Sequence, residues 1–208
     1  MLAWALVGLL FYSTAAALLT RDSPPAGAPS RWWLLLSVAL TYVGFNLICT
    51  SLLFATGFRA MEFRSSAMET TLLKGDKFMI DRSYYRRHFC NRQDLVVMRR
   101  EDFLTVKRVI AVAGDSIEGR SQQILLNGHL LDEPFIQHTM QVGTNPKQDT
   151  FGPITVLPGR YFVMGDNRDL SLDSRSPEFG QVDGDAIVGR PLYIYLSQSW
   201  SRNGRRLY

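Results

Sequence analysis

The sequence predicts a mainly β protein in which a multi-sheet β domain follows two transmembrane helices. Three observations support this prediction. The first 58 of the 208 residues contain only three charged side chains, whereas the other 150 contain 39. Two uncharged runs lie in the first part, and short β-rich runs bounded by turn residues fill the second. A single soluble domain is therefore not expected, although the mean hydropathy of −0.04 is ordinary for one.

The two uncharged runs are long enough to cross a bilayer as helices. They cover residues 2–20 and 32–58, and a hydrocarbon core of about 30 Å needs about 20 helical residues. Trp32 and Trp33 stand where an interfacial aromatic belt is expected. We expect transmembrane helix 1 over residues 1–20 and helix 2 over residues 32–58. The alternative for the first run is a cleaved signal peptide, and the lack of a positively charged start argues against it.

Residues 21–31 predict a short cytoplasmic loop between the two helices. The segment is rich in Pro, Gly and Ser, which favours a connector over a helix. Arg21 and Arg31 lie at its ends, and positive residues of short loops tend to remain cytoplasmic. The domain of residues 59–208 is then expected on the extracytoplasmic side, although arginines just after the second run weaken the charge asymmetry.

The remaining 150 residues show the pattern of an all-β domain built from several short sheets. The hairpin candidate is 124–131, because Asn127-Gly128 suits the positive φ angles of a type I′ turn. No helical stripe of twelve or more residues interrupts the domain. Further strands are predicted at 78–80, 95–98, 104–106 continuing into 109–112, 161–164 and 193–196.

Charge and cysteine content exclude several classes of function. The net charge is +4, and no basic stripe alternates with aromatic residues, so a nucleic-acid partner is not expected. Cys49 lies in an apolar run and Cys90 in a polar region, so neither a disulfide nor a metal site is predicted. The three histidines are interpreted as surface residues. The basic tail 202–206 is interpreted as a solvated end that could touch anionic lipid.

Lys107 is the first candidate for chemistry, because it stands inside the apolar run 104–110. In a strand, Lys107 and Val109 would share one face, and Arg108 would lie on the other. A lysine on an apolar face loses solvation, which disfavours its charged form and makes a neutral amine available as a base. The competing interpretation, which the pattern alone favours, is an edge strand with the lysine head in water.

Two further segments concentrate polar residues. Residues 65–76 begin shortly after the second apolar run, so a site there would lie near the membrane surface; small hydroxyl residues before a turn are also ordinary turn residues. Residues 165–175 follow a predicted strand and are rich in Asp, Asn and Arg. A cation-binding loop is one interpretation, but the arginines in the loop oppose it. A rigid loop held by Asp–Arg pairs is the interpretation preferred here.

Together these segments resemble the three signature segments of type I signal peptidases, the membrane-anchored serine proteases with a Ser–Lys dyad. Residues 65–76, 107–115 and 165–175 resemble them in order, and the position behind two apolar helices also fits. The third segment is the most specific, the first is moderately so and the second is weak by itself. The resemblance covers nearly the whole chain and implies no metal and no cofactor.

The resemblance also implies a role for each matching residue. The residue immediately before Met68 would be the serine that attacks the peptide carbonyl, and neutral Lys107 would take its proton. Ser65 would complete the oxyanion hole. Ser171 would orient the lysine amine, and the lysine-orienting loop would be supported by an ion pair of Asp173 and Arg175.

The sequence departs from the family pattern at the position that matters most. Ala67 occupies the usual nucleophile position, and alanine has no hydroxyl. Thr70 replaces the usual proline, and Leu170 stands where asparagine is usual. Three explanations remain open: an engineered Ser→Ala change, a natural inactive relative, or Ser66 as a substitute nucleophile. Against the last, a shift of one residue in an extended segment turns the side chain to the opposite face.

The function that the resemblance implies is that of a signal peptidase I-like serine endopeptidase. Its substrates would be signal-peptide-bearing preproteins, cut after small residues at a bacterial-type inner membrane, with membrane lipid as a second partner. The alternative is a non-catalytic, membrane-anchored peptide-binding relative that uses the same groove. A self-cleaving repressor-type protease shares the Ser–Lys chemistry, but two membrane helices and the lack of a DNA-binding region argue against it.

Overall fold

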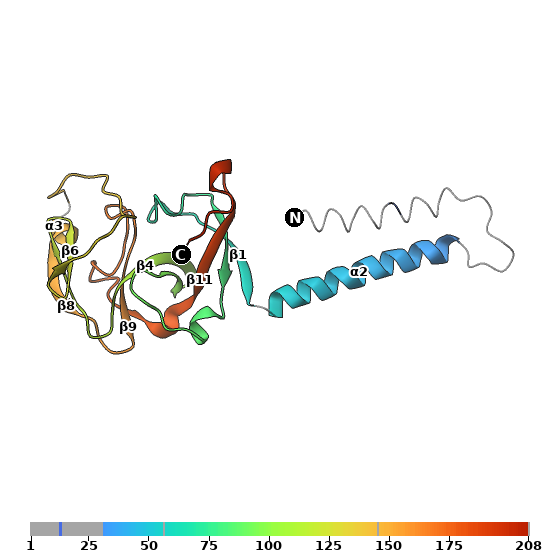
Figure 1. The fold of residues 1–208 in the computed structure, drawn as a ribbon, viewed down its shortest axis with the longest axis horizontal. Helices are drawn as coiled ribbons and strands as arrows, with labels where there is room; N and C mark the ends of the chain where they lie inside the picture. Colours follow the sequence, from blue (N-terminus) through green and yellow to red (C-terminus); the bar gives the residue numbers. More distant parts are fainter. Residues whose placement is uncertain (1–12, 14–30, 56, 145, 208) are drawn as a thin grey trace. The chain divides into compact units, whose positions relative to one another are not determined.

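The structure is a computed structural model that describes residues 13, 31–55, 57–144 and 146–207. It divides into two compact units, Met1–Thr56 and Gly57–Tyr208 (Figure 1). The helix predicted over residues 1–20 and the loop predicted over 21–31 lie outside the described residues, apart from residues 13 and 31.

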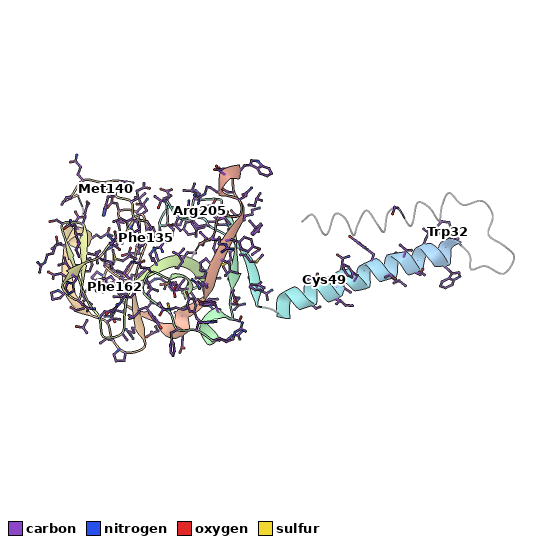
Figure 2. All side chains as sticks on the ribbon, in the orientation of Figure 1. Trp32, Cys49, Phe135, Met140, Phe162 and Arg205 are labelled. Carbon is purple, nitrogen blue, oxygen red and sulfur yellow. The ribbon has the colours of Figure 1, made fainter. Side chains whose placement is uncertain are left out.

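The first unit contains the helix α2 (Arg31–Ala55), which corresponds to the second uncharged run. Figure 2 labels two of its side chains, Trp32 and Cys49. The amide of Asn46 donates to the carbonyl of Tyr42 at 2.8 Å and so remains within its own helix. Among the helices of the described residues, none meets the length and hydropathy expected of a membrane span. The predicted end at residue 58 is three residues too late, because Phe58 already opens a strand.

The second unit contains two antiparallel sheets, which supports the prediction of a mainly β domain (Figure 1). The larger sheet has seven strands in the order β1-β2-β11-β3-β4-β9-β10, and the smaller has four in the order β7-β6-β5-β8. The strands of the larger sheet are β1 (Phe58–Glu62), β2 (Lys77–Asp81), β3 (Leu95–Arg100), β4 (Phe103–Val112), β9 (Arg160–Met164), β10 (Val182–Asp183) and β11 (Ile187–Leu196). Those of the smaller are β5 (Ser116–Arg120), β6 (Gln123–Leu126), β7 (His129–Leu130) and β8 (Phe151–Thr155).

Short helical turns connect these strands. They are η1 (Tyr84–Arg86), α3 (Pro146–Asp149), η2 (Gly184–Ala186) and η3 (Trp200–Arg202). The predicted hairpin is confirmed: β6 and β7 pair across Asn127 and Gly128, whose φ angles are 52° and 80°. Every strand predicted from the sequence is present. The strand β8 was not predicted, because its Gly152-Pro153 pair is unusual inside a strand.

The strand β4 has a central position that decides between the two interpretations of Lys107. It pairs with β3 on one side and with β9 on the other, so the edge-strand interpretation is wrong. Val109 belongs to one apolar cluster, and Val106 and Ile110 belong to two others. Lys107 is therefore placed by the strand in a buried environment, with an exposed fraction of 3%.

Candidate active site

Residues of the first two signature segments line one cavity of about 430 Å³. Ser65 and Ala67 from the first segment and Lys107 from the second line it. Leu170 and Leu172 from the third segment also reach it, so the third segment contributes apolar wall. The other lining residues are mostly apolar: Met61, Glu62, Phe63, Arg64, Phe78, Arg100, Phe103, Leu104, Thr105, Val106 and Phe179.

Lys107 has the environment that a lysine base requires. Its ammonium nitrogen Nζ lies 2.6 Å from the hydroxyl of Ser171 and 5.9 Å from the centre of the Phe179 ring. Burial lowers the pKa of Lys107 from 10.5 to about 8, although the charge of Asp173 opposes this shift. A buried cation without a directly bound carboxylate loses its proton more easily than one in water. A usable fraction of neutral amine therefore exists at neutral pH.

Asp173 and Arg175 form the ion pair that the family resemblance implies. Arg175 donates from Nε to Asp173 Oδ1 at 2.8 Å and from Nη2 to Oδ2 at 2.9 Å. Burial alone would raise the pKa of Asp173, but the hydrogen bonds and charge of Arg175 lower it below its ordinary value. Asp173 also accepts the backbone N–H of Gly165 at 3.0 Å. The pair thus fixes both ends of the loop that presents Ser171 to Lys107.

The backbone of the third segment holds position 67 in place. The N–H of Asn167 donates to the carbonyl of Ala67 at 3.1 Å. Gly165 lies so close that a Cβ atom there would overlap both the Ser171 hydroxyl and the Ala67 carbonyl. Only glycine fits between these two groups. The requirement could not be read from the residue pattern, because it depends on two segments meeting in space.

One of the two oxyanion donors implied by the resemblance, the backbone N–H of Ala67, is bonded to the side chain of the other, Ser65. The N–H of Ala67 donates to the hydroxyl oxygen of Ser65 at 3.1 Å. Ser65 is exposed and Ala67 is buried. An incoming carbonyl oxygen would replace Ser65 as the acceptor, and rotation of the Ser65 hydroxyl would then supply the second donor.

Ser66 has a different position from its neighbours. It does not line the cavity, whereas Ser65 and Ala67 do. The extended backbone assumed for this segment is also wrong, because a turn begins here. The Ser66 carbonyl accepts the N–H of Glu69 at 3.2 Å, and the Met68 carbonyl accepts that of Leu72 at 2.8 Å. A role for Ser66 as nucleophile would therefore require this turn to rearrange.

The backbone at position 70 has a conformation that proline cannot adopt. Thr70 adopts a φ angle of 55°, which lies in the left-handed region. Proline is restricted to φ near −65°, so the usual proline would not fit this turn. The Thr70 hydroxyl donates to the carbonyl of Phe135 at 2.7 Å and thereby links the turn to the segment before residue 140.

Several buried polar contacts escaped the sequence analysis. Arg108 pairs with Asp166 through two hydrogen bonds of 2.8 and 2.6 Å, and the Thr71 hydroxyl donates to the same carboxylate. These three residues tie the three signature segments together behind the cavity. The predicted rigid loop is thus confirmed, although only one of its pairs is internal, between Asp173 and Arg175.

Glu133 and His138 also anchor the loop of residues 165–175. Arg168 pairs with buried Glu133 rather than with an aspartate of its own segment. His138 was interpreted as a surface residue, but its ring nitrogen Nδ1 lies 3.2 Å from Asp169 and its Nε2 is buried. No pattern in the sequence pointed to these pairs, because the partners are about 30 residues apart.

Comparison with known proteins identifies the family. The sequence profile described as "Signal peptidase, peptidase S26" matches residues 32–196, which is most of the chain. This chain belongs to that family. The resemblance inferred from the three segments is therefore confirmed, and the match includes Ala67 and Lys107.

Bacterial type I signal peptidases are among the similar proteins. "Signal peptidase I P" of Bacillus subtilis subsp. natto is 30% identical over 145 residues, which cover 67% of this chain and 77% of that protein. "Signal peptidase I S" of Bacillus subtilis strain 168 is 41% identical over 109 residues, which cover 50% of this chain and 59% of that protein. The matched region thus spans little more than half the length of the latter relative.

A crystal structure of a signal peptidase I from Enterococcus faecalis is also similar. It is 26% identical, with a TM-score of 0.40, and the match covers 50% of this chain and 97% of that one.

Proposed function

We propose that this signal peptidase family member binds signal-peptide-bearing preproteins in the cavity beside Lys107. The reaction class supported by the site is serine endopeptidase cleavage after small residues. The observation that carries the proposal is Lys107 itself, which is buried in the wall of an apolar cavity and bonded to a hydroxyl instead of a carboxylate. A structural lysine in such a place would normally be paired with an acid.

The proposed chemistry follows from the positions of the groups. A hydroxyl at position 67 would attack the substrate carbonyl, while neutral Lys107 accepts the hydroxyl proton. The N–H of residue 67 and the hydroxyl of Ser65 would stabilise the oxyanion. The lysine would then return the proton to the leaving amine, and water would release the acyl group. Ser171 keeps the amine oriented throughout, and Asp173 and Arg175 hold Ser171.

The proposed place of action is the extracytoplasmic face of a bacterial-type inner membrane. The support is the pair of uncharged runs at residues 2–20 and 32–58, with the arginine-bearing segment between them. A site that begins within ten residues of the second run would meet substrates that are themselves held in the bilayer. Membrane lipid is therefore a proposed partner.

Ala67 favours a second candidate function, that of a non-catalytic peptide-binding relative. Alanine cannot attack a carbonyl, and Ser66 does not line the cavity. The groove, the oriented lysine and the ion pair would still receive a signal peptide. Under this candidate the chain recognises preproteins without cutting them, whether the alanine is natural or introduced.

The deciding experiment compares cleavage of one preprotein by four full-length variants in detergent micelles. They are the unchanged chain, Ala67→Ser, Ser66→Ala and the combination Ala67→Ser with Ser66→Ala. We expect cleavage only when serine occupies position 67, with or without Ser66. Photo-crosslinking of the same preprotein to the unchanged chain measures binding separately from cleavage.

The outcomes separate the candidates. Cleavage by the unchanged chain that Ser66→Ala abolishes would overturn the non-catalytic candidate and assign the nucleophile to Ser66. Crosslinking without cleavage, together with activity in Ala67→Ser, would support a binding protein with a restorable site. Absence of both crosslinking and restored cleavage would refute the proposed function altogether.

A further inference from the structure

The charged side chains around the cavity beside Lys107 are unequally matched. The charged residues that line this cavity are Glu62, Arg64, Arg100 and Lys107. Glu62 and Arg64 lie 3.6 Å from each other as an exposed ion pair. Among the described residues, neither Arg100 nor Lys107 is bonded to a carboxylate. The cavity wall therefore contains two basic groups whose hydrogen bonds go to uncharged oxygens.

These two basic groups lie near the same aromatic ring, that of Phe179. The guanidinium carbon of Arg100 is 4.1 Å from the ring centre, and the nitrogen Nζ of Lys107 is 5.9 Å from it. The guanidinium of Arg100 is held in place, because it donates to the carbonyls of Phe179 at 3.1 Å and of Glu178 at 2.6 Å. Arginine keeps its charge at every pH that proteins encounter. An anion built on Nζ would thus meet an opposite charge at the same cavity.

The Lys107 amine has the properties of a nucleophile as well as those of a base. The residue is only 3% exposed, and an N–H of the amine donates to the Ser171 hydroxyl at 2.6 Å. Burial lowers the pKa of Lys107 to about 8, so neutral amine is present at neutral pH. Alanine at position 67 offers no hydroxyl that could bond to it. The lone pair of the neutral amine is therefore available to an electrophile that can reach it.

Two carboxylates close to the amine would oppose an anion there, but each is neutralised by an arginine. Asp173 accepts two hydrogen bonds from Arg175. Asp166 accepts two from Arg108. The acids raise the pKa of Lys107, whereas the charge of Arg175 lowers it. The two ion pairs add no net charge beside the amine, so they leave a new anion at Lys107 without strong repulsion.

The walls of the cavity favour a small and uncharged electrophile. They are largely apolar, with Phe63, Phe78 and Val106 among the lining residues. The low exposure of Lys107 disfavours bulky reagents, and an apolar wall disfavours charged ones. Carbon dioxide is small, apolar and uncharged. It also reacts directly with unprotonated amines, and the product is a carbamate anion.

We propose that carbon dioxide modifies Lys107 to a carbamate, which Arg100 stabilises from the same cavity. The nitrogen lone pair forms a bond to the carbon atom, and the electron pair of one C=O bond moves to its oxygen. The nitrogen then gives one proton to solvent. One neutral amine and one carbon dioxide thus become one carbamate and one proton, without an oxidant or a reductant. The Ser171 hydroxyl is placed to donate to a carbamate oxygen.

The modification would regulate the proposed cleavage, and this consequence rests on the proposed function. The nitrogen of a carbamate is not basic, because its lone pair is delocalised into the carboxylate. It could not take a proton from a hydroxyl at position 67. In Ala67→Ser, cleavage should therefore fall as bicarbonate is raised at constant pH and ionic strength. The modification itself needs no hydroxyl at position 67, so it can be measured in the unchanged chain.

The test records carbon-13 NMR spectra of the full chain in neutral detergent, equilibrated with carbon-13 bicarbonate as the source of carbon dioxide. The unchanged chain is compared with Lys107→Met and with the control Lys74→Met, which changes an exposed lysine outside the cavity. Any signal from the terminal amine is common to all three. We expect a carbamate signal that Lys74→Met retains and Lys107→Met lacks. Absence of a signal that depends on Lys107 would overturn the proposal.

A second measurement locates the modification in the unchanged chain and so does not depend on the folding of a variant. A trialkyloxonium salt converts the carbamate into a stable ester, and mass spectrometry of the peptides identifies the lysine that carries it. We expect the ester on Lys107. An ester on Lys74 but not on Lys107 would refute the assignment.

A third comparison tests the contribution of Arg100. Arg100→Gln should lower the carbamate fraction at a fixed bicarbonate concentration by about three- to tenfold, since an opposite charge at the cavity is lost. The matched control Arg99→Gln changes the adjacent exposed arginine, which does not line the cavity, and should leave the fraction unchanged. Equal fractions in the two variants would contradict stabilisation by Arg100. Cleavage by Ala67→Ser is measured separately in degassed buffer, so failure of this proposal and failure of the proposed function are distinguishable.

Discussion

Two adjacent basic residues of β4, Lys107 and Arg108, are both buried but have opposite electrostatic environments. Lys107 is buried against Ser171 and an aromatic ring, and burial lowers its pKa to about 8. Arg108, the next residue, is also buried, but it makes two hydrogen bonds to the carboxylate of Asp166 and one to the carbonyl of Gln93. An arginine retains its proton at any pH that proteins encounter.

The difference teaches that burial alone does not make a base. A buried cation with a bound carboxylate is structural, because losing the proton would leave an unpaired anion. A buried cation that meets only a hydroxyl has no such penalty, so it can exchange its proton with a substrate group. Lysine suits position 107 and arginine suits position 108, since only lysine can be neutral near pH 8.

The largest expected effect is the loss of cleavage on removal of Lys107, measured in the Ala67→Ser variant, for which cleavage is expected. In Ala67→Ser, the additional change Lys107→Met should lower kcat/KM for a preprotein by about 10²–10⁴-fold, because the general base is lost. The control is Lys74→Met, the same change at an exposed lysine outside the cavity. Equal activity of Ala67→Ser with and without Lys107 would remove the dyad assignment.

A large effect on stability is expected at the buried ion pair of Arg108 and Asp166. Asp166→Asn should lower the free energy of unfolding by about 3–5 kcal/mol, because it leaves the buried Arg108 without a counter-charge. The matched control Asp183→Asn removes an exposed partner of Arg160 and should cost less than about 1 kcal/mol. Urea unfolding measures both values. Similar costs for the two variants would show that the Arg108 pair is not structural.

A smaller effect is expected in the pH dependence of activity and stability that Lys107 causes. Because neutral Lys107 is the proposed general base, kcat/KM of Ala67→Ser should rise with pH and level off above about 8. Stability should respond at higher pH than activity does. Between about pH 8 and 10.5 the unfolded chain holds the Lys107 proton more tightly than the folded chain does, so the free energy of unfolding increases with pH. Lys107→Met should lack that increase, and an unchanged slope would contradict the low pKa.

The smallest effect is expected on stability at acidic pH, through the ion pair of Arg92 and Asp115. Burial alone would raise the pKa of Asp115, but hydrogen bonds from Arg92 and Asn127 lower it from 3.8 to about 2. Its stabilising contribution is present above pH 4 and is lost as the pH falls toward 2. Since Arg92 is half exposed, the loss should be about 1 kcal/mol. Acid titration of Asp115→Asn, which should lack this component, measures it.

The sequence predicted the strands and the candidate residues better than it predicted their partners. The strands around Lys107 and the Asn127-Gly128 turn followed from local patterns, and Lys107, Ser171, Asp173 and Arg175 followed from the resemblance. The pairing of Arg168 with Glu133 and of His138 with Asp169 could not be predicted, because it depends on which distant segments meet. The central position of β4 was missed for the same reason, since strand order is not encoded in a local pattern.

The close approach of Gly165 to position 67 has an evolutionary consequence. The backbone at residue 67 is held by its carbonyl and by the glycine behind it, and neither contact involves the side chain. Alanine and serine codons of the matching series differ by a single base. Exchange between alanine and the serine that the proposed cleavage requires therefore needs one nucleotide change, and both of these backbone contacts are independent of it. A lineage could gain or lose the proposed activity at this single position, while the backbone contacts around it stay the same.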